Sequence, residues 1–495
     1  MKKKIIIGLI LVVLCTKSGY CQLWYITRGL NTDEVAWAVD TDEQGNIYWA
    51  IEQKDQWPHW YYNIVLFKIN QNGQEIWQSE SWDNGTGFND IAFVATVSGN
   101  SIYLAGRTDS TGLNTSGDAL LMKYNTVDGQ LDWAKNIITE ADFGYQEIDG
   151  ISVQPDGIFL TGWTQGEETD MDILIQKCDL SGNTSWENSW DFEFFQRFDG
   201  ANGHLAIDND FIYVAASVKR TNIGSLDGDG ALVCFSRING DYQWNESWTG
   251  ALYSDALGLT MSTDSMLYTV GYSGTFDFGS QILLNKFSRN GNLIWTKTWG
   301  GTGTEDSRTV VADGDSIVYV VGTTSSYGDS DKDIFVLKYD SFGNLVDSII
   351  WGGPYLECAQ DAVLWDSYMF ITGETQSFGN GQINQDHKTD GLLLKIDVRT
   401  MTAPEHEFSE NSISTNKNEF NIYPNPFCDK FFINFRDING LYDMEIFDIS
   451  GKSATKALNV VSGDIFDFSC YDTGLYIIRI KEKNKVAASL KIIKN

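Results

Sequence analysis

A short motif, Gly-x-Leu-x-Trp followed by a second Trp, recurs about every fifty residues between residues 22 and 400. The clearest copies are GQEIWQSESW from Gly73, GNTSWENSW from Gly182, GDYQWNESW from Gly240 and GNLIWTKTWGG from Gly291. A fixed period of this length indicates a repeat architecture, in which each copy buries its apolar face against its neighbours. The motif therefore constrains the fold strongly, but it does not identify a ligand.

Two further features repeat in step with this motif. An apolar run ends at seven equivalent positions, 52 to 57 residues apart: Lys68, Lys123, Lys177, Cys234, Lys286, Lys338 and Lys395. A polar residue stands five places earlier in each copy: Asn63, Asp118, Asp172, Asp229, Gln281, Asp333 and Asp390. Each copy has four strand candidates, rich in β-branched and aromatic residues, and none has a long amphipathic helix. The sequence predicts an all-β fold, a seven-bladed β-propeller with four antiparallel strands per blade, over residues 22–400.

The two ends of the repeat region are incomplete in complementary ways. The first copy begins at Leu23-Trp24 without the preceding half of its motif, and the last copy stops after Lys395 without its fourth strand. We therefore predict that an N-terminal strand at 22–28 completes the seventh blade, which would leave no open sheet edge at the ends of the ring.

The N-terminus has the features of a secretory signal peptide. Three lysines, Lys2 to Lys4, precede an apolar run from Ile5 to Cys15, and Gly19-x-Cys21 offers a small-residue cleavage site, so residues 1–21 are read as the signal. A lipoprotein signal is the alternative, although the large residues Leu14 and Tyr20 precede the two cysteines. No later apolar run reaches about 18 residues, so we expect no transmembrane segment in the mature chain.

The chain carries a net charge of −32, and the acidic excess lies almost entirely in the repeat region. Such a surface repels nucleic acid and favours solubility, cations or basic partners, and we expect a monomer. Five cysteines remain after the signal, an odd number without CxxC spacing, so neither a disulfide framework nor a zinc site is expected. A bond between Cys428 and Cys470 is left open.

The repeat pattern stops after Thr400. Residues 401–420 are polar and aperiodic, and are read as a linker. In residues 421–495 strands alternate with turns, which predicts a small β-sandwich.

Both parts resemble known families. Residues 299–395, beginning WGGTGTEDSRTVVADGDSIVYVVGTT, resemble the bacterial SBBP β-propeller repeats, and KYNTVDGQLDW is distantly similar to quinoprotein repeats. The last 75 residues resemble the type A sorting domain of type IX secretion. The residues that carry this second resemblance include Tyr423, Pro424, Asn425, Pro426, Gly451, Gly474 and Tyr476, with a basic tail from Lys481 onward. The usual aliphatic-Ser run appears as FSCYDTGLY, with Phe468 at the aliphatic place.

The sorting resemblance implies a Gram-negative cell of the Bacteroidota type. The chain would cross the inner membrane by its signal, engage an outer-membrane type IX translocon from the periplasm, and end at the cell surface or outside the cell. Whether the C-terminal domain is then removed stays open. The alternative is that the sandwich serves only as an adhesive module.

A series of acids suggests a metal site. Asp90, Asp255, Asp306 and Glu357 each stand thirteen residues before the aromatic of the second strand, and Asp33, Asp149 and Asp199 occupy similar places. At the start of the innermost strands, seven acids would ring one mouth of the central channel, and their carboxylate oxygens would suit Ca²⁺. The alternative is that each acid accepts hydrogen bonds from its own turn.

One aromatic segment lies outside the repeat. The candidate ligand contacts in it are Trp57, His59, Trp60, Tyr61 and Tyr62, with a loop folded onto the rim as the alternative. The remaining Trp residues occur at repeat positions, which favours packing between blades, and the repeated Asp and Lys are expected to form a hydrogen-bond network between blades.

No catalytic residues are predicted, because the four His are scattered and no hydrolase or phosphate-binding motif is found. The sequence favours a secreted or surface propeller that binds a protein or glycan. A polysaccharide hydrolase or lyase, and a quinoprotein-like propeller, are the alternatives. No cofactor is expected beyond the candidate Ca²⁺.

Overall fold

The computed structural model describes residues 23–29, 33–54, 61–84, 89–109, 117–137, 145–165, 171–191, 200–219, 228–248, 253–275, 279–328, 331–379, 388–404, 420–423, 430–435, 442–448, 453–460, 464–471, 474–482 and 485–494. The chain divides into two compact units, residues 1–408 and 409–495, and each is described by itself.

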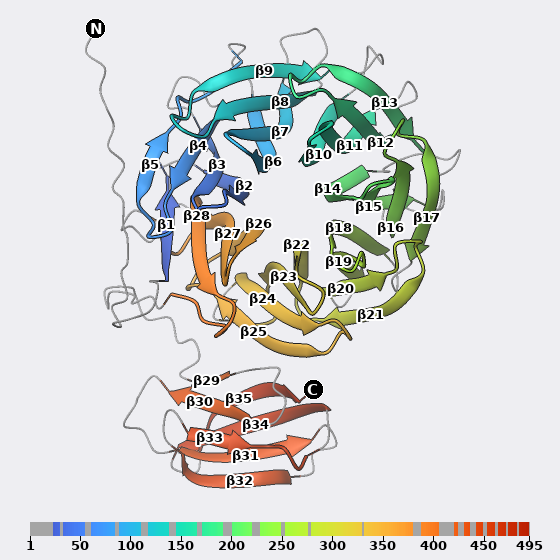
Figure 1. Ribbon diagram of the computed structural model, residues 1–495. Helices are drawn as coiled ribbons and strands as arrows, with labels where there is room; N and C mark the ends of the chain where they lie inside the picture. The colour runs from blue at the N-terminus through green and yellow to red at the C-terminus, as the bar shows by residue number, and fades with distance from the viewer. Residues whose placement is uncertain are drawn as a thin grey trace, which may run out of the picture. The chain divides into compact units, whose positions relative to one another are not determined.

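The first unit is a ring of seven four-stranded antiparallel sheets (Figure 1). The strands of blades one to four are β2 (Val35–Thr41), β3 (Ile47–Lys54), β4 (Tyr62–Ile69) and β5 (Glu75–Gln78); β6 (Asp90–Ser98), β7 (Ser101–Asp109), β8 (Gly117–Asn125) and β9 (Leu131–Ile137); β10 (Gln146–Gln154), β11 (Gly157–Gln165), β12 (Met171–Cys178) and β13 (Thr184–Trp190); β14 (Gly200–Ile207), β15 (Phe211–Lys219), β16 (Gly228–Ser236) and β17 (Tyr242–Trp248).

The strands of blades five to seven are β18 (Tyr253–Met261), β19 (Leu267–Thr275), β20 (Gly279–Phe287) and β21 (Leu293–Trp299); β22 (Glu305–Asp313), β23 (Ile317–Thr324), β24 (Asp333–Asp340) and β25 (Leu345–Trp351); β26 (Glu357–Trp365), β27 (Tyr368–Thr375), β28 (Asp390–Asp397) and β1 (Trp24–Arg28). This arrangement confirms the predicted seven-bladed propeller.

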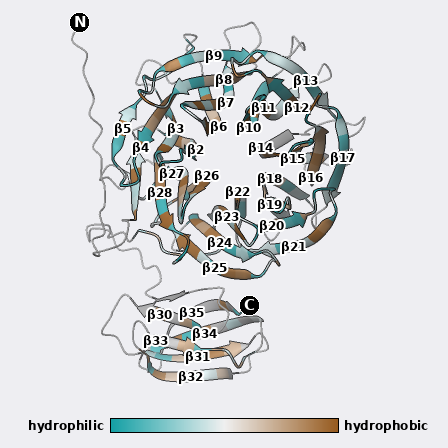
Figure 2. Cartoon of the chain, viewed as in Figure 1, coloured by the Kyte–Doolittle hydropathy of each residue, from teal (hydrophilic) through white to brown (hydrophobic). Residues whose placement is uncertain are grey.

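The position of a strand within its blade explains its composition. Second and third strands such as β3 and β4 are almost continuously buried, because neighbouring blades cover both of their faces. Fourth strands form the outer wall: β5 exposes most of its residues, and those of β17 are exposed or half-buried. Outer strands such as β13 and β17 are accordingly coloured as largely hydrophilic in Figure 2.

The two ends of the ring are joined as predicted. β1 pairs with β28 in antiparallel register from Trp24 opposite Lys395 to Arg28 opposite Gly391. Trp24 is fully buried, and its indole N–H donates to the Gln71 carbonyl at 3.0 Å. The N-terminal strand therefore supplies the fourth strand of blade seven.

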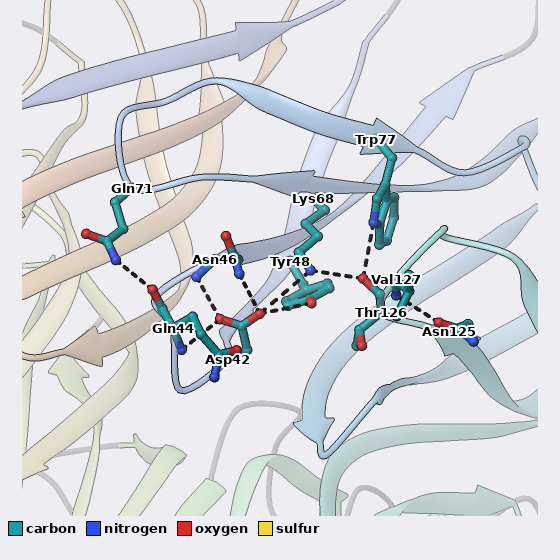
Figure 3. A network of polar contacts seen from close by, with 10 residues as sticks. All are labelled: Asp42, Gln44, Asn46, Tyr48, Lys68, Gln71, Trp77, Asn125, Thr126 and Val127. Carbon is teal, nitrogen blue, oxygen red and sulfur yellow. Dashed lines mark hydrogen bonds and ion pairs between the residues drawn. The ribbon is translucent and has the colours of Figure 1, made fainter.

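The repeated Gly and Trp meet across successive blades. Trp77 of blade one lies under the turn of blade two at Gly129, where an added Cβ would come within 2.6 Å of the indole. The Trp77 indole N–H and the Lys68 ammonium both donate to the Thr126 carbonyl, at 3.2 and 2.9 Å (Figure 3). Gly129 has a φ of 73°, which a residue with a side chain adopts reluctantly.

Related contacts recur around the ring. The glycine turn lies against the preceding blade's Trp in five further pairs: Gly73 with Trp24, Gly182 with Trp133, Gly240 with Trp186, Gly291 with Trp244, and Gly343 with Trp295. The lysine donates to the next blade's turn carbonyl in three further pairs: Lys286 to Ser341, Lys338 to Val398, and Lys395 to Gln71. These contacts confirm that the Trp and Lys repeats join the blades.

The junction between blades six and seven is the exception. Asp347 stands opposite Lys338, where the other fourth strands carry Trp. The third and fourth strands of blade seven come from opposite ends of the chain, so no glycine hairpin is there to receive a Trp. Instead, the Trp351 indole N–H donates to the Pro404 carbonyl at 3.2 Å. Residues 401–404, expected to begin the linker, therefore pack on the propeller.

The second unit is a sandwich of two sheets, as predicted. One sheet has the order β29-β30-β33 and the other β32-β31-β34-β35. The strands are β29 (Phe420–Tyr423), β30 (Lys430–Phe435), β31 (Tyr442–Asp448), β32 (Ser453–Val460), β33 (Asp464–Asp467), β34 (Gly474–Glu482) and β35 (Lys485–Lys494). Phe431 and Ile433 of the first sheet share one core with Ile446 and Ile478 of the second.

Candidate functional site

All seven first strands, which are the innermost strands of their blades, carry a register shift against their second strands. In six blades one extra residue forms the bulge: Trp37, Phe93, Asp149, Leu257, Arg308 and Gln360. In blade four, residues 202–204 occupy this place. Bulges redirect side chains and often lie next to binding sites. We call the six named residues the axial ring, because the first strands surround the propeller axis (Figure 1).

The axial ring differs from its surroundings in both burial and chemistry. The residue before each bulge is buried and mostly small, as at Ala36, Ala92, Ala256 and Ser307. The axial residues themselves are half-buried or exposed, and they include aromatic, acidic, aliphatic, guanidinium and amide side chains. Packing favours small residues before the bulge in most blades but does not require this variety in the bulge itself. The axial ring is therefore the place in the repeat where side chains are available to a ligand.

On one side, blades one and two bring aromatic rings together. Trp37 and Phe93 meet edge to face, with ring centroids 5.2 Å apart. The Trp37 indole N–H donates to Glu52 on the neighbouring strand at 2.5 Å. Burial raises the pKa of Glu52 to about 7, although the Trp37 hydrogen bond and the Arg107 charge oppose the shift. Glu52 is therefore a carboxyl group that changes charge near neutral pH.

Blade three continues this surface. Tyr145 stacks on Trp163 with a centroid distance of 4.5 Å and an interplanar angle of 9°. The Arg107 guanidinium lies 5.2 Å from the Tyr145 ring and 5.9 Å from the Phe93 ring, and it forms a 3.1 Å ion pair with Glu147. We call Trp37, Phe93, Tyr145 and Trp163 the aromatic strip. Its rings are half-buried, so each keeps some surface accessible.

Two carboxyl groups of blade three form a pair. Glu147 and Asp149 hydrogen-bond to each other, and the Tyr145 hydroxyl donates to Glu147 at 3.1 Å. Burial raises the pKa of both groups, and the Glu147 charge further raises the pKa of Asp149 well above its usual range. Two adjacent carboxylates with little water around them do not ionise together readily, so the environment favours a proton shared by the pair.

Next to blade one around the ring, blades seven and six present polar groups. The Arg308 side chain is 49% exposed, and its nearest acid, Asp306, lies 4.0 Å away, beyond hydrogen-bond distance. Burial raises the pKa of Asp306, opposed by Arg308 and Lys332. Oδ1 of Asp306 and Oε1 of Gln360 are buried, and within the described part of the chain neither accepts a hydrogen bond.

The seven acids predicted at the mouth do not occupy equivalent positions. Asp90 and Glu357 are fully buried and accept hydrogen bonds from the turns before their strands, from the Asn84 N–H at 3.2 Å and the Gly353 N–H at 2.6 Å. In blade six the equivalent residue is Glu305, which accepts from the Gly301 N–H at 3.2 Å. Asp90 and Glu357 therefore fit the alternative, in which each acid accepts hydrogen bonds from its own turn.

The remaining members of that series lie elsewhere. Asp149, Asp255 and Asp306 are half-buried residues of the axial side, Asp33 accepts from the Thr389 N–H at 3.3 Å, and Asp199 lies outside the described residues. In the described ranges no group of three or more His, Cys, Asp or Glu side chains is placed to hold a metal ion. Calcium binding by this series stays a prediction, which calcium and EDTA titration of the melting temperature would test.

Unequal hairpin loops explain this division. The loop between the first and second strands has two residues in blades two and seven but is longer in blades five and six. A constant spacing of thirteen residues therefore reaches different strand positions, and a shift of one residue reverses the face. Trp37, Arg107, Glu147 and Arg308 were not predicted from the sequence, because the bulges that place Trp37 and Arg308 depend on the pairing of two strands.

The aromatic segment is described in part. Trp57, His59 and Trp60 lie outside the described residues. Tyr61 and Tyr62 are half-buried, and the Lys54 ammonium lies 5.0 Å from the centre of the Tyr62 ring. The connection from β3 to β4 thus begins after Lys54. Lys54 is two residues beyond Glu52, which bonds to Trp37 of the axial ring.

The second unit places several expected sorting residues. Tyr476 is buried and meets Phe468 edge to face at 5.1 Å, and Gly474 begins β34 with a φ of 148°. The side chain of Tyr423 and residues 424–426 and 451 lie outside the described set. Residues 421–495 match the secretion system C-terminal sorting domain. This sorting domain marks the chain for the type IX secretion machinery and for export to the cell surface or beyond.

Known structures are similar in fold only. The polysaccharide lyase Uly1 is 11% identical with a TM-score of 0.45, covering 73% of this chain and 89% of that chain. The β-propeller domain of the Trilobed protease from Pyrococcus furiosus, which has an open velcro topology, is 12% identical with a TM-score of 0.42, covering 75% and 100%. A protein of unknown function from Dyadobacter fermentans is 11% identical with a TM-score of 0.41, covering 60% and 92%.

No curated protein shows significant sequence similarity to the chain. In the part of the chain that the structure describes, no helix is long and apolar enough to cross a membrane. The resemblance of the repeat region to SBBP repeats stays a prediction.

Proposed function

We propose that this exported protein is a binding module whose propeller takes a glycan at the axial ring. The observation that carries the proposal is the contrast between the buried, mostly small residues before each bulge and the accessible, chemically varied residues in the bulges themselves. A residue that repeats serves the blade, whereas a residue that varies among equivalent accessible positions is free to serve a ligand.

The chemistry of the axial side suits a sugar better than an apolar molecule. The aromatic strip offers ring faces and edges against which the C–H face of a sugar ring packs. Carboxyl, guanidinium and amide groups lie around the same axis and match hydroxyl groups. Binding sites generally combine such an apolar surface with a few placed polar groups. The segment with Trp57, His59, Trp60, Tyr61 and Tyr62 is joined to this side through Lys54, and we include it as a further contact.

The test is binding of the exported protein to an oligosaccharide array, followed by calorimetry with the strongest binder. We expect Trp37→Ala to weaken binding by about tenfold or more, because stacking surface is lost. Trp133→Phe at a blade junction is the control for loss of an indole outside the axis. A protein partner captured in place of any oligosaccharide would contradict the proposal.

A second candidate, cleavage of a polysaccharide, is favoured by the hydrogen-bonded Glu147–Asp149 pair. A carboxyl group with a raised pKa beside a second carboxyl group is an arrangement that general acid–base catalysis uses. Incubation of polysaccharides with the exported protein tests this candidate, with Glu147→Gln as the inactive comparison. Release of new chain ends that Glu147→Gln abolishes would favour the enzyme, and no release would favour binding alone.

A further inference from the structure

Three polar groups at blades six and seven have unused hydrogen-bonding capacity. Oδ1 of Asp306 and Oε1 of Gln360 are buried acceptors without a donor among the described residues. The Arg308 side chain is 49% exposed, and among the described residues it pairs only with Asp306, at 4.0 Å. Buried polar atoms in native proteins are nearly always paired, so the two buried oxygen atoms call for an external partner, and the exposed Arg308 beside them is free to donate.

These groups lie on one side of the axis. Asp306 and Arg308 are two residues apart in β22, and Gln360 is the bulge residue of β26. The two strands belong to neighbouring blades and pack together, since the Ala359 N–H donates to Thr323, which pairs with Asp306. Two acceptors and a multiple donor thus lie on the innermost strands of adjacent blades.

Together, these three side chains favour one class of ligand over others. A carboxylate or sulfate offers acceptors to Arg308 but no donor to Asp306 or Gln360. A cation offers donors to Asp306 and Gln360 but repels Arg308. Neighbouring hydroxyl groups both donate and accept, so they satisfy all three groups at once.

The negative charge around these three residues also disfavours an anionic ligand. Asp255 and Glu374 lie near this position: burial raises the pKa of Asp306, the charge of Asp255 adds to that rise, and burial also raises the pKa of Glu374. The whole chain carries −32, which repels an anionic polymer as it approaches.

We propose that Asp306, Arg308 and Gln360 form a subsite for the hydroxyl groups of an uncharged glycan. The inference rests on the proposed glycan-binding function and names the ligand class. Sugar hydroxyls replace the missing partners of Asp306 and Gln360, while the guanidinium fork of Arg308 donates to ring or hydroxyl oxygens. The aromatic strip, which begins at Trp37 in the blade next to Gln360, contacts the neighbouring sugar unit of the chain.

The experiment compares two probe sets, neutral hexose oligosaccharides and galacturonate oligosaccharides of the same length, on the exported full chain. We expect the neutral set to bind with an affinity that changes little with salt, because no net charge is paired. Arg308→Ala and Gln360→Ala should each lower that affinity by about tenfold. Arg399→Ala and Gln243→Ala, which remove exposed side chains elsewhere on the propeller, should leave it unchanged.

The outcomes separate this inference from the proposed function. Binding of galacturonate alone, weakened by salt, would overturn the neutral class but keep a glycan-binding protein. Binding of neutral sugars that Arg308→Ala, Gln360→Ala and Asp306→Asn all leave intact, with normal melting, would overturn the subsite. Failure of both probe sets together with failure of the full array would overturn the proposed function itself. Asp306→Asn keeps the shape of the side chain, so a loss of binding there with an unchanged melting temperature supports the subsite.

Discussion

The blade junctions and the axial ring use the same seven sheets in opposite ways. At a junction, a Trp meets the glycine turn of the next blade, and the same pairing is found at six of the seven junctions. At the axis, six equivalent bulge positions carry six different residues. The difference shows that stability is concentrated where residues repeat, which leaves the axis free to vary.

Removal of β1 should have the greatest consequence. Deleting residues 23–28 takes away the fourth strand of blade seven and leaves the Lys395 side chain, which is fully buried, without its Trp24 neighbour. We expect loss of cooperative unfolding and rapid proteolysis of the propeller, measured by circular dichroism and limited digestion. A deletion variant that melts like the wild type would show that the ring does not depend on this closure.

The second largest effect on stability is expected from a substitution at a single blade junction. Trp77→Ala removes a half-buried indole from the blade one–two contact, together with its bond to the Thr126 carbonyl. A loss of about 3 kcal/mol in the free energy of unfolding is expected, measured by urea denaturation. Ile76→Ala on the same strand is the control, since that side chain is 49% exposed. Equal effects of the two substitutions would contradict the role given to the junction Trp.

The buried turn acids should make stability depend on pH. Burial raises the pKa of Asp90 to about 7, despite the hydrogen bond from Thr108. The folded state then holds a proton that the unfolded state releases near pH 4, so stability is highest below that pH and falls as pH rises to about 7.

The pH dependence that Asp90 causes can be measured as the difference in stability between the wild type and a variant without this carboxyl group. Between about pH 4 and 7 the wild type should lose roughly 1 to 4 kcal/mol relative to Asp90→Asn, whose amide does not titrate. Melting curves of both proteins across this range provide the measurement, with Asp210→Asn, an exposed site, as control. Parallel curves for wild type and Asp90→Asn would mean that Asp90 stays ionised.

The axial ring should give the smallest effect on folding. Arg308→Ala removes an exposed side chain that holds no hydrogen bond to the described residues, so the free energy of unfolding should change by less than about 0.5 kcal/mol. Urea denaturation is again the measurement. A large loss of stability would show that Arg308 supports the fold, and the contrast between axis and junction would no longer hold.

Much of the propeller could be predicted because its information is local and repeated. The incomplete first and last copies were enough to predict that an N-terminal strand completes blade seven, and the pairing of Trp24 with Lys395 confirms it. The Trp and Lys spacings were enough to predict contacts between blades. Asp347 breaks the motif at the junction where no hairpin receives a Trp, a reason that becomes visible only once the ring closes.

The axial site could not be predicted, because a bulge depends on pairing with another strand. Nothing in the sequence of Trp37 or Arg308 states that the register shifts there, and a shift of one residue changes which side chains face the axis. The same effect divided the acid series, since Asp90 and Asp306 share a spacing to the second strand but lie on opposite faces.

The pairing of β1 with β28 also determines how the ring would respond to mechanical force. The strands are antiparallel, so the N-terminal end of β1 at Trp24 lies beside the C-terminal end of β28 at Lys395. A pull between the two chain ends would act on one end of this ladder and separate its residue pairs in sequence, as in a zipper. A protein held at the surface by its C-terminal part, with its N-terminus unloaded, puts no tension on β1. Tension applied to the N-terminus would instead begin to open the ring at blade seven.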